Sequence, residues 1–158
     1  MAEDRPKRIA IIAGHGGLDE AYPPLILATS AVAMEMEAAI FFTFYGLFIV
    51  HKERKNRLKV APVGNAAMPV PVPNIIGILP GMTNMATGMM KNWMKKANTA
   101  SIDDLLEMCI EFDVRLISCQ MSMDVMGIKK EDLIDGIETA GAASFLEYAM
   151  DADITLYM

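Results

Sequence analysis

Short apolar runs that alternate with helical patterns are the feature that most constrains the fold of this chain. The run KRIAIIA at 7–13 is continuous and ends in GHGG at 14–17. Such a run is typical of a strand that is covered on both faces of a parallel sheet. A helical pattern follows over 25–36. We expect this helix to open at Pro23 and Pro24, because proline is tolerated in a first helical turn.

The rest of the chain continues this alternation outside one central segment. We expect further strands over 39–44, 114–118, 137–140 and 154–158, and further helices over 82–96, 101–112, 122–126 and 142–150. Strands that alternate with helices predict an α/β fold, a three-layer sandwich around a mostly parallel central sheet. The length of 158 residues suits a single domain over 1–158 with a self-sufficient core.

A basic and proline-rich insertion interrupts the pattern at about 51–80. Its first part, HKERKNRLK at 51–59, holds five of the fourteen lysines and arginines. Repeated proline over 61–74 removes backbone donors, so we expect an extended or mobile loop here and no sheet strand. Such a loop is a candidate lid or subunit contact, and a poorly ordered insertion is the alternative. The basic run is either a solvated loop or a guide for an acidic carrier protein or a membrane surface.

Composition and charge exclude several classes of protein. A net charge of −6 argues against a dedicated nucleic-acid binder, which normally has a basic face. Two cysteines are too few for a secreted disulfide scaffold and indicate thiols of a reducing cytoplasm, and the first residues lack a signal-peptide pattern. The thirteen uncharged residues at 38–50 are too few for a spanning helix, which needs roughly 20, so we expect no stable membrane insertion.

Cys119 is the candidate functional residue. It follows the predicted strand 114–118 directly, and ligands of open α/β sheets bind beyond the carboxyl ends of the strands. Backbone amides and the positive end of the next helix would stabilise a thiolate there, which favours sulfur transfer or redox chemistry. Cys109 has apolar neighbours on a predicted helix, which favours a core position. It could form a disulfide with Cys119 only if their Cα atoms lie within about 7 Å.

The block LISCQMSMDVMGI at 116–128, together with GHGG at 14–17 and the long insertion, resembles the DsrE/DsrF-like family. The resemblance covers most of the chain, is most specific around Cys119, and points to the long-insertion branch that is sometimes labelled peroxiredoxin. It implies a flavodoxin-like α/β fold, usually oligomeric. It also implies that Cys119 holds sulfane sulfur as a persulfide and passes it to a partner thiol, with sulfurtransferase activity left open. The peroxiredoxin label has no support, because neither a thioredoxin-like order of elements nor a peroxidatic motif is present.

Two further segments are candidates for binding a ligand near Cys119. In the first segment, glycines let backbone amides approach an anion such as a phosphate or a persulfide, and an imidazole could donate to a sulfur anion. These residues are Gly14, His15, Gly16 and Gly17. They would lie near Cys119 if their strands are neighbours; a tight turn without a ligand and a surface imidazole are the alternatives. The second segment, which follows Cys119 directly, comprises Gln120, Met121 and Ser122.

Other functions remain open beside that of a sulfur carrier with protein thiol partners. One is a non-catalytic binding or assembly module, because the many hydrophobic runs predict a homo-oligomer with apolar surface between its subunits. Another is a nucleotide-binding protein that uses the glycine loop. A third is a Cu(I) protein, since soft sulfur ligands suit this ion; its ligand set would be Cys119, Met121, Met123 and Met126. Most methionines follow helical spacing, however, and we expect no metal or cofactor.

Overall fold

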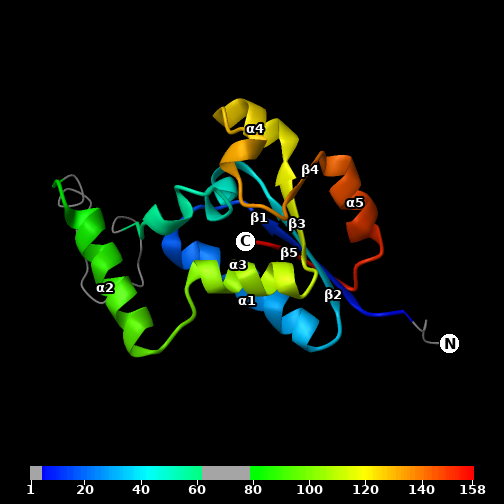
Figure 1. Ribbon diagram of the computed structural model, residues 1–158, viewed down its shortest axis with the longest axis horizontal. Coiled ribbons are helices and arrows are strands. Elements are labelled where there is room, and N and C mark those ends of the chain that lie inside the picture. Colours follow the sequence, from blue (N-terminus) through cyan, green and yellow to red (C-terminus); the bar gives the residue numbers. More distant parts are fainter. Residues whose placement is uncertain (1–4, 62–78) are drawn as a thin grey trace.

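The computed structural model describes residues 5–61 and 79–158, and its centre is one sheet of five parallel strands. The strands are β1 (Arg8–Ala13), β2 (Glu37–Phe42), β3 (Arg115–Cys119), β4 (Glu138–Ala140) and β5 (Ile154–Tyr157). Their order across the sheet is β4-β3-β2-β1-β5 (Figure 1). The predicted strands are therefore confirmed, and the sheet is entirely parallel in the described part of the chain. The strand order places β2 between β1 and β3.

Helices cover both faces of this sheet. They are α1 (Leu18–Ala33), α2 (Met82–Lys96), α3 (Ile102–Glu111), α4 (Gln120–Met126) and α5 (Ala142–Met150), with short 3₁₀ turns η1 (Phe44–Ile49), η2 (Lys55–Arg57) and η4 (Lys130–Asp132). Figure 1 shows α1 and α3 together on one side of the sheet and α5 on the other. The layers are those of the predicted three-layer α/β sandwich. Helix α2 lies apart from the sheet, at the end of the molecule opposite α5 (Figure 1).

Successive strand residues point to opposite faces, so the core has two parts. The larger part lies under α1 and α3 and includes Ile11 of β1 and Leu116 of β3. The smaller part lies under α5, where Phe145 stacks on Phe41 of β2 with 4.8 Å between ring centroids. Because both faces are covered, the inner strands β1 and β2 are nearly continuous apolar runs with no polar alternation. This arrangement is the physical basis of the pattern at 7–13.

Helix α1 begins seven residues before the predicted start at 25, which corrects that expectation. Gly17 is its N-cap, and the Gly17 amide donates to the Glu20 carboxylate at 2.9 Å. Pro23 and Pro24 therefore lie inside the helix and not in its first turn. The hydrogen bond from Gly17 to Glu20 satisfies an otherwise free amide and fixes the start at the glycine loop.

The first part of the insertion is packed against the body of the protein. Leu58 and Val60 are buried, the Val60 amide donates to Thr87 Oγ1 of α2 at 3.0 Å, and the Leu18 amide donates to the Lys59 carbonyl at 3.0 Å. The expected extended loop over 61–74 falls almost entirely on residues 62–78, outside the described residues. Within 5–61 and 79–158, no helix combines the length and apolar character that crossing a bilayer requires.

Candidate functional site

Cys119 occupies the position that the sequence predicts at the carboxyl edge of the sheet. It is the last residue of β3 and the N-cap of α4, with φ −71° and ψ 113°. The registers pair Ala13 with Phe42 and Phe42 with Ser118, so the backbones of Cys119, Thr43 and Gly14 are level at this edge. The strand ends thus form a row in which β2 separates Cys119 from the glycine loop.

The side chain of Cys119 is buried, which the sequence did not indicate. It is 4% exposed and packs in the smaller core with Ile117, Phe41 and Phe145. Across the sheet it is paired with Ala140 of β4. The cause is strand alternation, since Cys119 faces the same side as Ile117, and α5 covers that side. The thiol therefore lies at the carboxyl ends of the strands, but it is covered by the corner where β4 turns into α5.

Cys109 is a core residue, as its apolar neighbours predict. It lies on α3 without exposed surface, in the larger core on the opposite face of the sheet from Cys119. Burial raises the pKa of the Cys109 thiol to about 12. A thiolate is the nucleophilic form, so this cysteine is inert near neutral pH.

The three residues that follow Cys119 point in different directions. The Gln120 amide donates to the Asp124 carboxylate at 2.8 Å on the exposed side of α4, and Met121 is 58% exposed. Ser122 is fully buried, and its hydroxyl lies 2.8 Å from the Thr43 hydroxyl at the end of β2. Ser122 therefore attaches α4 to the neighbouring strand end, and the three side chains do not converge on one point.

The glycine loop is two strands away from Cys119, about 10 Å at ordinary strand spacing. Its amides at both ends are already hydrogen-bonded, Gly14 to the Met158 carbonyl at 2.7 Å and Gly17 to Glu20. A Cβ atom at Gly16 would lie 2.5 Å from the carbonyl oxygen of Tyr45. Close packing against η1 thus requires glycine at this position, whether or not a ligand binds.

His15 lies on the side of β1 that is turned away from Cys119. Its ring is exposed and makes an edge contact with Tyr157 of β5, with 5.8 Å between centroids. Since β5 pairs with β1 on the side opposite β2, this contact directs the imidazole away from β3. The structure does not bring His15 to the thiol.

The four sulfurs of the Cu(I) hypothesis are dispersed. Cys119 and Met123 are buried in the two cores on opposite faces of the sheet, and Met121 is exposed. In the described ranges, no group of three or more histidine, cysteine, aspartate or glutamate side chains is arranged to hold a metal ion.

Two residues near the thiol were not identified from the sequence. Thr43 directly follows β2 and is level with Cys119 at the end of β3, so its position after an apolar run was the available signal. Phe145 of α5 belongs to the same buried cluster as the thiol and stacks on Phe41, and helical periodicity alone cannot assign it to one partner on the sheet.

A parallel α/β sandwich with a thiol at the end of an inner strand is the class of protein that the fold and the site define. Residues 5–157 match the DsrE/DsrF/DrsH-like family, and the chain belongs to this family. The resemblance seen in the block around Cys119 is thereby confirmed.

Relatives extend over nearly the whole chain. The chain is 48% identical over 158 residues to the sulfur carrier protein DsrE2 of Allochromatium vinosum, covering 96% of this chain and 98% of that protein. It is 33% identical over 165 residues to the uncharacterized protein YrkE of Bacillus subtilis, covering 98% and 99%. The crystal structure of the ychN protein from E. coli shares the fold, with a TM-score of 0.59 at 17% identity and coverage of 96% and 99%.

Proposed function

We propose that this protein is a sulfur carrier that holds sulfane sulfur as a persulfide on Cys119 and passes it to a thiol of a partner protein. The observation that carries the proposal is the contrast between the two cysteines of a chain that is 48% identical to a sulfur carrier. Cys119 ends a strand at the carboxyl edge of the sheet, whereas Cys109 is sealed in the core with a pKa raised to about 12. This contrast supports Cys119, and not Cys109, as the residue that exchanges sulfur with another molecule.

The reaction is an exchange in which no net oxidation occurs. The Cys119 thiolate attacks the outer sulfur of a donor persulfide, the new S–S bond forms on Cys119, and the donor's S–S bond breaks to release its thiolate. The proton of the outer sulfur travels with that sulfur. An acceptor thiolate then attacks the outer sulfur on Cys119 and regenerates the Cys119 thiolate.

Access to Cys119 requires local opening of the corner between β4 and α5. Strand β4 has three residues and lies at the edge of the sheet, next to Cys119. The residues that turn from it into α5, Gly141 to Ala143, are small and exposed. Short edge elements with few buried contacts open at a fraction of the global free energy of unfolding. Opening here uncovers the thiol and leaves the larger core intact.

Loading is tested by intact mass spectrometry after incubation with polysulfide. The wild type and Cys109→Ser should each gain the mass of one or more sulfur atoms, reversibly on addition of a reductant. Cys119→Ser should gain none. Normal loading of Cys119→Ser, or loss of loading in a folded Cys109→Ser, would overturn the assignment to Cys119.

The proposed partners are donor and acceptor proteins with reactive thiols, in the reducing cytoplasm, and the proposed assembly is a homo-oligomer. The support for assembly is an exposed apolar surface around a cavity of about 470 Å³ between α5 and β5. Its exposed members include Leu146, Met150 and Tyr157. Sedimentation velocity should detect an oligomer for the wild type and for Met34→Glu on the exposed end of α1, and a monomer for Met150→Glu. A monomeric wild type would contradict the proposed homo-oligomer.

A further inference from the structure

A second cavity, of about 320 Å³, lies between α1, η2, α2 and the start of α3. It belongs to the α1 and α3 side of the sheet, whereas Cys119 faces α5. Its charged lining residues are all lysines, although the whole chain carries a net charge of −6. The lining residues are Leu18, Tyr22, Lys55, Asn56, Lys91, Met94, Lys95, Thr99, Ser101 and Ile102. This cavity is not used by the sulfur chemistry.

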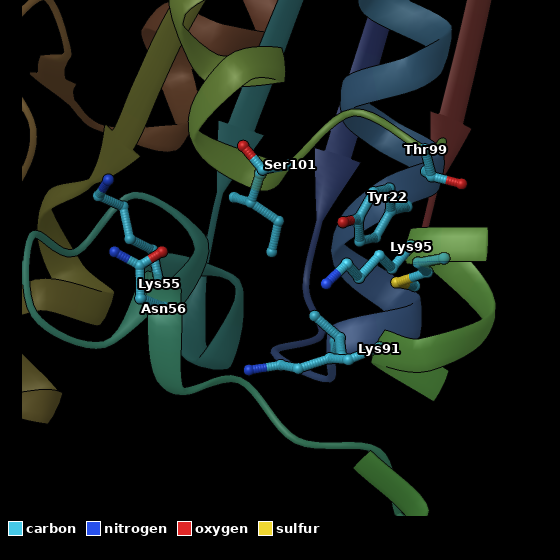
Figure 2. A pocket seen from close by; sticks show the side chains of 10 residues that line it. Tyr22, Lys55, Asn56, Lys91, Lys95, Thr99 and Ser101 are labelled. Carbon is cyan, nitrogen blue, oxygen red and sulfur yellow. The ribbon is translucent and has the colours of Figure 1, made fainter. Parts of the chain in front are cut away.

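Two of the lysines are free to bind a ligand. Lys91 and Lys95 are one turn apart on α2, and Figure 2 shows the Lys95 ammonium beside Tyr22 and the Lys91 side chain extending below it toward the side of Asn56. Neither has an ion-pair or hydrogen-bond partner among residues 5–61 and 79–158. The third lysine, Lys55, is paired with Asp103 of α3. The two ammonium groups, which have no partner in the described part of the chain, give this wall a positive charge, and the Asp104 carboxylate near Tyr22 offsets part of it.

The other walls supply apolar and polar contacts. Leu18 and Ile102 are buried residues that form part of the wall, and Asn56 and Tyr22 add an amide and a hydroxyl. Burial of the phenol raises the pKa of Tyr22, and the nearby Asp104 carboxylate adds to this effect, so the hydroxyl is a donor at neutral pH. Asp104 itself is bound by the Ser101 hydroxyl at 2.7 Å.

We propose that this cavity binds a small phosphate monoester, with the phosphate between Lys91 and Lys95 and the organic group against Leu18 and Ile102. A phosphate monoester carries about −1.5 to −2 charges at pH 7, which two unpaired ammonium groups match. Lysine is an established phosphate ligand as a mobile point charge. The volume lies at the lower end of the range for small-molecule sites, roughly 300–1,000 Å³, which fits a ligand with one small ring.

The presence of Lys91 and Lys95 has a competing explanation, because they lie near the C-terminal end of α2 and cations stabilise the C-terminal turn of a helix. Lys96 separates the two explanations. It lies in the same last turn of α2 but does not line the cavity. Lys96→Gln therefore removes a helix-end charge and leaves the cavity unchanged.

Isothermal titration of the full chain with phenyl phosphate at low salt tests the site. We expect binding by the wild type that weakens with salt, a loss of at least about ten-fold in Lys91→Gln/Lys95→Gln, and a change within about two-fold in Lys96→Gln. Lys91→Arg/Lys95→Arg should retain binding. Inorganic phosphate and phenol should each bind more weakly than phenyl phosphate.

Absence of phenyl phosphate binding by the wild type would overturn the proposal, as would equal losses in Lys96→Gln and the double variant. Equal affinity for phenol would exclude a phosphate site, and equal affinity for inorganic phosphate would exclude an organic ligand. None of these results depends on sulfur loading by Cys119, so this proposal and the sulfur-carrier proposal fail separately.

Discussion

Cys109 and Cys119 are ten positions apart in the chain and lie on opposite faces of one parallel sheet. Cys109 packs under α1 and α3, and Cys119 packs under α5. The backbone of β3, with its neighbours β2 and β4, stands between the two thiols. Each cysteine is free in the structure, and the sheet imposes a different environment on each.

We expect no intramolecular disulfide in the native protein, because the two thiols can meet only if the sheet is disrupted. The measurement is mass spectrometry under non-reducing conditions after treatment with diamide. The unfolded chain in denaturant is the positive control, since it brings the two cysteines together freely. Formation of the bond at the same rate in native and denatured protein would contradict the placement.

The elements of the fold were predictable where apolar runs and helical patterns were long. The helix at 82–96 has the predicted bounds, and the strand before Cys119 is displaced by one residue. The start of α1 was missed because Pro23 and Pro24 are usual first-turn residues, whereas the actual signal was the N-cap Gly17 with Glu20 three residues later, whose carboxylate accepts from the Gly17 amide. The hydrogen bond between the Gly17 amide and the Glu20 side chain determined where the helix starts, and the preference of proline for a first helical turn did not.

The candidate site was predictable in its backbone position but not in its surroundings. Periodicity identifies Cys119 as a strand-end residue, but it does not give the order of strands. The chain places β2 between the glycine loop and Cys119, so the condition for proximity of His15 and Cys119, that their strands are neighbours, is not met. The thiol is buried in a cluster that includes Phe145, which is 26 positions later and is brought there only by tertiary packing.

Phe145→Leu should increase the reactivity of Cys119. The smaller side chain weakens the cover of the thiol and lowers the free energy of opening by about 1–2 kcal/mol, which corresponds to roughly a ten-fold faster reaction. The measurement is the rate of alkylation by iodoacetamide in a Cys109→Ser background. Glu147→Ala is the matched control on the exposed side of α5, with an expected change of about two-fold or less. An unchanged rate in a folded Phe145→Leu protein would exclude Phe145 as the cover.

The hydroxyl pair of Ser122 and Thr43 should stabilise the strand-end segment. Ser122→Ala leaves the Thr43 hydroxyl without its partner at 2.8 Å, and we expect a loss of about 1–2 kcal/mol in the free energy of unfolding. A denaturant double-mutant cycle with Thr43→Val should give a coupling energy of about 1 kcal/mol. Ser144→Ala, on α5, is the control and should combine additively with Thr43→Val. Additivity of the Ser122 and Thr43 changes would exclude a stabilising contact.

The buried Cys109 thiol should make the protein lose stability at alkaline pH. Its folded pKa is raised to about 12, and an unfolded cysteine ionises near 8.5. The folded state therefore holds the proton more tightly, and the contribution is complete below about pH 8.5 and is lost as pH rises toward 12. Cys109→Ala removes this group, so its free energy of unfolding should fall less steeply between pH 8.5 and 10.5 than that of the wild type.

Denaturant titrations at several pH values measure these slopes. Tyr22 and Tyr148, whose pKa values burial also raises, remain in both proteins and contribute equally. Ile102→Val is the matched control, because it reduces packing on the same helix without removing an ionising group. It should lower stability by about 0.5–1.5 kcal/mol at every pH and keep the wild-type slope. Parallel slopes for Cys109→Ala and the wild type would show that the native thiol ionises as readily as the unfolded one, against its sealed position on α3.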